Sequence, residues 1–289
     1  MSHLVALLLA GFSALPVTKS PVEDQKPLSL AFGVYQSDKA TVMYRSFTPV
    51  LEALMVSMEE RLGRSVDINL TIFRSYEDGI DSLARGEVDF VRFGPASYIT
   101  AVAKQPDLQL IAMETESGDK RFKGLIVVQK ESPIRKIGDL RGKSFAFGDP
   151  NSTIGRYLVQ AQLVENGITG RDLSEYRYLG RHDTVVKAVE IGDFDAGSVM
   201  QQTFEKANAK GTLRVLASFE NVTKPWVARK GLDRPTLEAI QASLYALKDP
   251  AVLKELKISG FVPTSDEEYR LVREGMKLAE AFEIPRGGN

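Results

Sequence analysis

Hydroxyl side chains stand where one helix of this sequence is expected to begin. Ser152 and Thr153 lie in the stretch GDPNSTIG (148–155), which leads from an apolar strand through a tight turn into a helical pattern. The start of a helix carries free N–H groups and the positive end of the helix dipole, so it binds anions readily. The pair therefore predicts either an oxyanion site or, more simply, an N-cap at Ser152 that stabilises the helix by about 1 kcal/mol.

Two other loops share this order of strand, turn and polar helix start. FGPASY (93–98) places Ser97 and Tyr98 at the start of a helix, and LGRHDTVV (179–186) places His182 there. An imidazole can donate a hydrogen bond to an anion, and small shifts in its pKa change its charge near neutral pH. Ligands of open α/β sheets bind at the carboxyl ends of the strands, where all three loops are expected. Three such loops favour an anion pocket, with a capping or surface histidine as the alternative for His182.

Three further side chains are weaker candidates. Tyr35 follows the first expected strand and could form the rim of a cleft. Asp195 begins a later strand and could orient His182 or accept a proton from a ligand, although a carboxylate that only caps a turn explains it equally well. Trp226 could line the cleft or pack in the core.

An alternation of apolar strands and amphipathic helices positions these residues. The periodicity predicts strands at 28–34, 66–73, 88–94, 108–116, 122–130, 144–148, 176–180, 195–199 and 213–220. It predicts helices at 45–63, 75–87, 95–105, 152–167, 182–191, 234–247, 250–256 and 266–282. Such alternation is typical of parallel or mixed sheets covered by helices.

A repeated turn indicates two lobes of one plan. The runs GEVD (86–89) and GDFD (192–195) each end a helix and lead into a strand. Chance recurrence of a common turn is the alternative. The strand at 213–220 is expected to carry the chain back to the first lobe. We therefore expect four parts: a leader and linker at 1–27, a first lobe at 28–116, a second lobe at 117–212, and a return to the first lobe with C-terminal helices at 213–289.

Composition excludes several kinds of chemistry. The chain has 289 residues, a formal net charge of −1 and no cysteine, so it forms no disulfide and has no thiolate nucleophile. Its basic residues are interspersed with acidic ones, which argues against a nucleic-acid partner. No HExxH motif or histidine cluster predicts a metal, and no G-x-S-x-G elbow supports a hydrolase. GDLRGKS (138–144) is one residue short of a phosphate-binding loop and precedes a strand instead of a helix. We expect a binding protein without a cofactor, not an enzyme.

The N-terminal run LVALLLAGFSALPV (4–17) has the length and apolarity of a signal-peptide core, and it is too short to span a bilayer. Export is therefore expected, with an N-terminal helix packed in the core as the alternative.

Three long segments resemble the phosphate, phosphite and phosphonate substrate-binding components of bacterial ABC importers: GEVDFVRFGPASYI, GLIVVQKESPIRKIGDLRGKSFAFGDPNSTIGRYL and GRHDTVVKAVEIGDFDAG. The resemblance implies an α/β, two-lobed periplasmic binding protein fold of type II-like order. Each lobe would be a mixed sheet wrapped by helices, and a two-strand hinge would join them. It also implies that a phosphorus oxyanion is captured by lobe closure in the periplasm and delivered to a membrane permease. We expect the protein to act as a monomer.

The family's ligand-binding residues map onto positions already singled out. The resemblance assigns the Ser-Thr pair to Ser152 and Thr153, the histidine to His182, and the tyrosine with its neighbouring serine to Tyr98 and Ser97; Asp195 and Tyr35 match looser parts of the pattern. The choice among phosphate, phosphite and alkylphosphonates stays open. The alternatives in function are a periplasmic sensory subunit that partners a membrane kinase, and an enzyme on the same fold.

Overall fold

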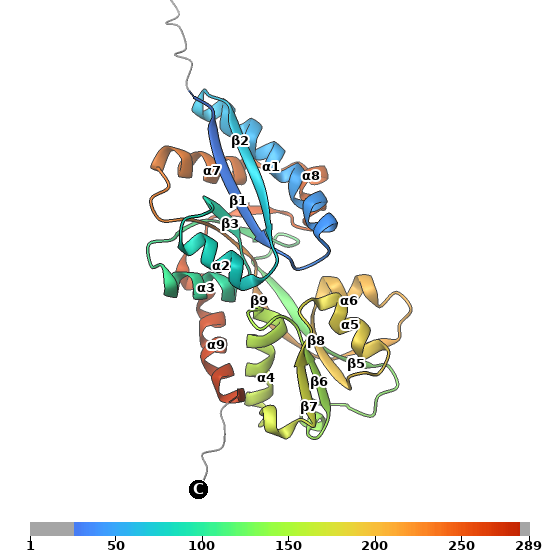
Figure 1. Ribbon diagram of the computed structural model, residues 1–289. Coiled ribbons are helices and arrows are strands. Elements are labelled where there is room, and N and C mark those ends of the chain that lie inside the picture. Colours follow the sequence, from blue (N-terminus) through green and yellow to red (C-terminus); the bar gives the residue numbers. More distant parts are fainter. Residues whose placement is uncertain (1–25, 284–289) are drawn as a thin grey trace, which may run out of the picture.

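Two α/β lobes follow one another in the computed structural model, which describes residues 26–283 (Figure 1). The first lobe contains a six-stranded sheet in the order β11-β4-β10-β3-β1-β2. Its strands are β1 (Leu28–Tyr35), β2 (Val66–Phe73), β3 (Phe90–Arg92), β4 (Gln109–Thr115), β10 (Pro225–Ala228) and β11 (Gly260–Val262). Its helices are α1 (Ala40–Leu62), α2 (Tyr76–Ala84), α3 (Pro95–Lys104), α7 (Arg234–Ala246) and α8 (Pro250–Lys254).

The second lobe contains a five-stranded sheet in the order β7-β6-β8-β5-β9. Its strands are β5 (Arg121–Gln129), β6 (Ser144–Phe147), β7 (Glu175–Tyr178), β8 (Ala196–Met200) and β9 (Leu213–Val222). A π-helical turn, η2 (Thr153–Leu158), opens into α4 (Val159–Glu165), and α5 (His182–Glu190) and α6 (Gln201–Ala207) complete this lobe. Both sheets are mixed and covered by helices, as the sequence predicts.

The two sheets repeat one strand plan. In the first, β1 lies parallel to β2 and β3, and β10 runs antiparallel beside β3. In the second, β6 lies parallel to β7 and β8, and β5 runs antiparallel beside β8. The repeated turn does the same task in both: Asp89 accepts a hydrogen bond from the N–H of Ala31 at 2.8 Å, and Asp195 accepts one from the N–H of Ser144 at 2.9 Å. Each carboxylate thus fastens a neighbouring parallel strand, at the fourth residue of β1 and at the first residue of β6.

Two short connections carry the chain between the sheets. Residues 116–120 lead from β4 to β5, and residues 223–224 lead back from β9 to β10. The connections are joined to each other, because the N–H of Thr223 donates to the carbonyl of Lys120 at 2.9 Å and its hydroxyl donates to the carbonyl of Glu114 at 2.5 Å. This pair of crossing segments is the two-strand hinge.

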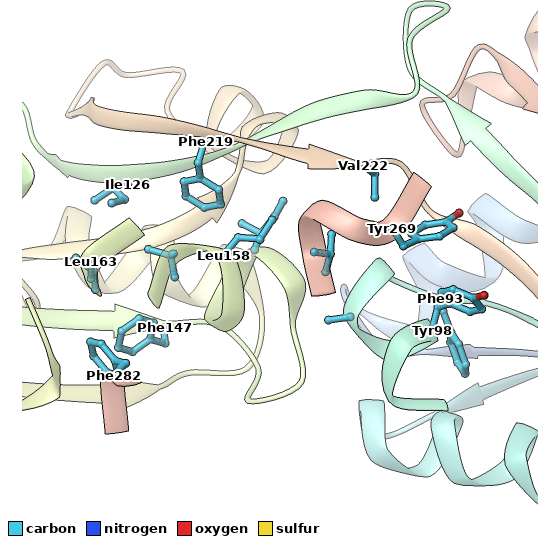
Figure 2. Packing of buried hydrophobic residues seen from close by; sticks show 14 of the residues in the cluster. Phe93, Tyr98, Ile126, Phe147, Leu158, Leu163, Phe219, Val222, Tyr269 and Phe282 are labelled. Carbon is cyan, nitrogen blue, oxygen red and sulfur yellow. The ribbon is translucent and has the colours of Figure 1, made fainter. Parts of the chain in front are cut away.

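A third passage crosses between the lobes near the C-terminus. After β11 the chain forms η4 (Asp266–Tyr269) and α9 (Arg270–Glu283), and α9 packs beside α4 and η2 of the second lobe (Figure 1). One buried apolar cluster, called the interlobe cluster below, continues through this contact. Figure 2 shows it running from Phe147, Leu163 and Phe282 through Leu158 and Tyr269 to Phe93 and Tyr98.

Among the features that differ from the sequence prediction, three concern how the two lobes are built. Helix α1 begins at Ala40, five residues before the expected start, and it continues through Pro49. Strand β9 pairs with β5 in the second sheet, so the return to the first lobe begins at β10 and not at residue 213. Strands β10 and β11 have only 4 and 3 residues, too few for a periodicity to identify them.

The expected signal segment lies outside the described residues. Between residues 26 and 283, no helix is both long enough and apolar enough to cross a membrane.

Candidate functional site

A cavity of about 550 Å³ lies between the lobes, where strands of both sheets end. Its lining includes the last residue of β1, the first residue of α2, and the residues that open α3, η2 and α5. Five residues represent these elements: Tyr35, Tyr76, Pro95, Thr153 and His182. The site therefore forms where parallel strands of both lobes give way to helix starts, as expected for sheets of this kind.

Tyr35 is the last residue of β1, and its hydroxyl lies at the N-terminus of α3. Its phenolic oxygen accepts hydrogen bonds from the N–H of Gly94 at 2.5 Å and from the hydroxyl of Ser97 at 3.2 Å. The position of Gly94 requires a glycine, since a Cβ there would lie 2.9 Å from the Tyr35 oxygen and 3.4 Å from the Thr153 hydroxyl. With both lone pairs of its oxygen engaged, Tyr35 keeps only a hydrogen to offer to the cavity.

Thr153 and Ser152 repeat this arrangement from the second lobe. The hydroxyl oxygen of Thr153 accepts from the N–H of Ala96 in the first turn of α3, at 2.9 Å. The hydroxyl oxygen of Ser152 accepts from the N–H of Gly155 at 2.9 Å, so Ser152 is an N-cap as well as a lining residue. Both oxygens accept from backbone N–H groups at helix starts, and their hydroxyl hydrogens stay available.

Tyr76 is a lining residue that the sequence analysis missed. It begins α2 after the N-cap Ser75, and its ring stacks on that of Tyr35 with centroids 3.6 Å apart. The segment FRSYEDG that holds it has the same strand, turn and helix order as the three loops chosen from sequence, so the signal was present. Burial raises the pKa of Tyr35 and of Tyr76, which keeps both hydroxyls protonated and able to donate.

His182 lines the second-lobe wall as an uncharged ring. Burial lowers its pKa to about 4, a backbone hydrogen bond at Ser198 opposes that change, and Lys224 adds to it. Its Nδ1 is buried and has no hydrogen-bond partner. Neutral imidazole carries one hydrogen, so this ring presents an acceptor as well as a donor.

Positive charge predominates in the lining. Its basic residues are Lys39, Arg45, Arg92, Lys206, Lys224 and Lys257, against the acidic residues Asp38, Asp183 and Glu255. Such an excess favours an anionic ligand.

The two most buried cations are held by carboxylates at the hinge. Arg92 donates to both oxygens of Glu114, at 2.9 and 3.0 Å, and Lys224 lies 3.4 Å from Glu116. Burial acts to raise the pKa of Glu114, but Arg92, together with Lys224 and Trp226, more than offsets it and holds that pKa below the ordinary value. These ion pairs fix the cationic groups in the wall and reduce the net charge they present.

Apolar side chains complete the lining. Phe47 and Met43 come from α1, and Phe122, Ile154 and Met200 come from the second lobe. The cavity therefore combines a polar region at the helix starts with apolar walls on both sides, which suits an anion that carries a small apolar substituent.

Two predicted residues from α3 lie behind the site. Tyr98 is not part of the lining: its hydroxyl donates to Asp266 at 3.0 Å and its ring packs against Tyr269 in the interlobe cluster. Ser97 is almost fully buried and reaches the cavity only through its hydrogen bond to Tyr35. The helix start was read correctly, but the rotation of α3 turns these two side chains away from the ligand space.

Asp195 lies beside β8 of the second sheet, away from the cavity. Its carboxylate accepts from both the N–H and the hydroxyl of Ser144, at 2.9 and 3.0 Å. Ser144 begins β6, whereas Ser152 follows the end of β6, so Asp195 lies at the opposite edge of the sheet from the site. The prediction that it orients His182 or contacts the ligand is therefore wrong, and the turn-capping alternative describes it.

Trp226 packs in the first-lobe core. Its ring is fully buried against Phe32, and its N–H donates to Glu114 at 3.1 Å. Among residues 26–283, no group of three or more histidine, aspartate or glutamate side chains could hold a metal ion.

Comparisons with known proteins agree with this architecture. Residues 32–269 match the family model described as "ABC transporter, phosphonate, periplasmic substrate-binding protein". The chain is 24% identical to the probable ABC transporter phosphite binding protein PhnD1 of Prochlorococcus marinus, over 96% of this chain and 99% of that one. It is 25% identical to the phosphonates-binding periplasmic protein of Escherichia coli, over 94% and 83% of the two chains.

A solved structure shows the same fold. That of PhnD1 from Prochlorococcus marinus in complex with methylphosphonate superimposes with a TM-score of 0.77 at 21% identity, covering 88% of this chain and 98% of that one. The comparisons give no support to the sensory alternative. The role of the matched family is to bind a solute for transport, not to transform it. Because the family model covers both lobes and the hinge, the chain belongs to the phosphonate family of periplasmic substrate-binding proteins of ABC transporters.

Proposed function

We propose that this protein binds a phosphorus oxyanion in the interlobe cavity after export and delivers it to the membrane permease of an ABC importer. The observation that carries the proposal is the set of hydroxyl groups at the helix starts. Tyr35, Ser152 and Thr153 each accept hydrogen bonds from backbone N–H groups and are left with hydrogens to donate. Tyr76 adds a fourth hydroxyl beside them.

Such a set suits an oxyanion for an electrostatic reason. Each hydroxyl that accepts from a helix N-terminus is polarised by that bond, so it becomes a stronger donor to the ligand. Donors from both lobes converge, so a ligand that accepts from all of them ties the lobes together. Closure of lobes around a ligand is the motion that a permease can detect.

The apolar walls favour a ligand with one non-oxygen substituent. Met43, Phe47, Phe122, Ile154 and Met200 flank the polar region and would face the fourth group on phosphorus. The names of two relatives, one phosphite-binding and one phosphonates-binding, support the same class, as does a neighbouring structure in complex with methylphosphonate. Methylphosphonate and phosphite are therefore the first ligands to test.

A thermal-shift panel on the purified protein tests the proposal. It compares methylphosphonate, phosphite, phosphate and 2-aminoethylphosphonate with sulfate, taurine and an amino-acid mixture. A ligand at a hundred times its Kd stabilises the folded state by about 2.7 kcal/mol, which such an assay detects. A shift with a phosphorus compound supports the proposal; a shift only with taurine or amino acids would overturn the ligand class.

A further inference from the structure

The solvent side of the cavity, called the mouth below, carries two lysines. Lys206 near the end of α6 and Lys257 after α8 belong to the lining and are exposed, whereas the hydroxyl residues Ser152 and Thr153 are buried. The ion pairs formed between residues 26 and 283 include neither lysine. The cavity therefore has a buried end that offers hydroxyl donors and a mouth that offers positive charge.

Contacts across the mouth bring the two lysines to the same region. Gln202 of α6 also lines the cavity, and its side-chain amide donates to the carboxylate of Glu116 at 2.8 Å and to the carbonyl of Lys257 at 3.5 Å. Lys206 is at the i+4 position from Gln202, so it lies one turn further along the same face of α6. One lysine from each lobe thus flanks this contact.

The carboxylates of the lining do not neutralise the mouth. Asp183 is paired with an arginine of its own loop at 2.9 and 3.1 Å, and Glu255 lies 3.8 Å from Arg45. Asp38 accepts the N–H of the lysine that follows it at 2.6 Å, and that lysine offsets its charge. The positive charge of the two mouth lysines is therefore left in excess, which attracts an anionic group.

The backbone at Lys257 favours glycine, yet the chain has a lysine there. Its φ is 56°, in the left-handed region. It ends α8, since its N–H donates to the carbonyl of Lys254 at 2.9 Å and the N–H of Ile258 donates to that of Leu253 at 3.3 Å. Glycine usually takes this place at a helix end, because a Cβ there costs free energy. Strained residues of this kind cluster at ligand sites, which points to a ligand contact for the Lys257 side chain.

The cavity has room for a ligand that reaches both ends. Its volume is about 550 Å³. Cavities of about 300–1,000 Å³ hold drug-sized ligands, whereas methylphosphonate has only a few non-hydrogen atoms. A phosphono group at the helix starts leaves space for a substituent that extends past the half-buried apolar side chains of Phe122 and Met200 toward the mouth.

We propose that the mouth binds a second anionic group of the ligand through Lys206 and Lys257, so that the protein takes phosphonates whose apolar substituent ends in a carboxylate. The inference rests on the proposed function and adds to it the substrate class. The hydroxyl donors hold the phosphono group, the apolar walls face the chain of the substituent, and the lysines hold its far end.

The test compares three ligands that share a phosphono group and a short chain. 3-Phosphonopropionate ends in a carboxylate, 3-phosphonopropionamide in an uncharged amide of the same shape, and 3-aminopropylphosphonate in an ammonium group. Isothermal titration calorimetry on the full chain at pH 7.5 should give a Kd for the carboxylate at least fivefold below that for the amide. The ammonium ligand should bind most weakly, because the mouth repels it.

Matched variants locate the effect in the mouth. Lys206→Ala combined with Lys257→Gly should reduce the preference for carboxylate over amide to less than twofold. Lys210→Ala combined with Lys254→Ala removes the same charge from exposed lysines outside the lining and should keep the full preference.

The single variant Lys257→Gly distinguishes a ligand contact from a structural role. It should lower the preference for carboxylate and at the same time raise the Tm by about 1–3 °C, because glycine relieves the left-handed backbone. A lower Tm with the preference retained would show that the lysine serves the fold, and would overturn its assignment to the ligand.

The outcomes separate this inference from the proposed function. Similar Kd values for the carboxylate and the amide, or tighter binding of the ammonium ligand, overturn the inference and leave the phosphorus ligand in place. An undiminished preference in the variant that lacks both mouth lysines overturns it as well. Failure of all three ligands and of methylphosphonate to bind overturns the proposed function itself.

Discussion

The hydroxyl oxygen of Thr153 in the second lobe accepts a hydrogen bond from the backbone N–H of Ala96 in the first lobe, over 2.9 Å. The Thr153 side chain thereby accepts from a free N–H at the start of α3, links the two lobes, and keeps a hydroxyl hydrogen that it can donate into the cavity. The hydroxyl of Thr153 therefore belongs both to the lining of the cavity and to the contact between the lobes.

Replacement of Thr153 by valine should weaken ligand binding by about 10- to 100-fold. The change keeps the shape of the side chain and removes one donor to a charged ligand, a loss of about 1.5–3 kcal/mol in binding. It also leaves the N–H of Ala96 without its acceptor, so the stability of the folded protein should fall as well. Calorimetry with methylphosphonate measures the loss of affinity. Thr184→Val, at an exposed position of α5, is the matched control and should bind as the wild type does. An unchanged Kd in Thr153→Val would exclude its hydroxyl from the ligand contacts.

Two tyrosine variants distinguish a residue that lines the cavity from one that packs behind it. Tyr35→Phe leaves the Gly94 N–H and the Ser97 hydroxyl without an acceptor, so it should lower stability by about 1–3 kcal/mol and weaken binding at least tenfold. Tyr98→Phe removes only the bond to Asp266 and should bind ligand within twofold of the wild type. Urea unfolding and calorimetry provide the two measurements. Equal losses of affinity in both variants would contradict the placement of Tyr98 outside the cavity.

The buried ion pair at the hinge should dominate the acid sensitivity of the first lobe. Glu114→Gln leaves the guanidinium of Arg92 without its counter-charge and should destabilise the fold by about 3–5 kcal/mol. Arg234 and Glu238 form an exposed pair on α7, so Glu238→Gln should change stability by less than about 0.5 kcal/mol.

The pH dependence of this pair has a definite sign. The pKa of Glu114 is lower in the folded protein than in the unfolded chain, where it is about 4.3. Its contribution is therefore complete above that unfolded value and is lost as the pH falls through the lower folded one. Urea unfolding between pH 6 and pH 3 should show a steeper loss of stability in the wild type than in Glu114→Gln. Parallel curves would show that Glu114 does not carry the effect.

Asp195→Ala should reduce stability without changing affinity. The substitution removes the acceptor for the N–H and hydroxyl of Ser144 at the start of β6, a loss of about 1 kcal/mol. Asp89→Ala, at the equivalent turn of the first lobe, should behave in the same way. A thermal scan with and without methylphosphonate compares them, and a loss of ligand-induced stabilisation in Asp195→Ala would restore a direct role for this residue.

The sequence was informative where a local signal has one structural meaning. A strand followed by a turn and a polar helix start identified the positions of Ser152, Thr153 and His182, because the start of a helix fixes where its free N–H groups lie. The repeated turn identified the shared plan of the lobes, since Asp89 and Asp195 answer the same need in each sheet.

The sequence was uninformative where the answer depends on a third element. Tyr98 is in a correctly predicted helix start, but only the packing of Tyr269 on α3 decides which way its ring turns. The local sequence of β9 predicts a strand but does not indicate which sheet the strand joins. Its place in the second sheet follows from pairing with β5, about ninety residues earlier. Neither relationship is encoded in a local pattern.

The course of α9 affects how far the two lobes can move apart. The chain enters α9 from the first lobe, but α9 packs on α4 of the second lobe. The interlobe cluster is continuous beneath this contact. Moving α9 away from α4 would expose this apolar surface to water, which costs free energy, so the contact restricts how far the two lobes can move apart. Substitutions that trim the apolar contacts of α9 should therefore widen the range over which the lobes can open.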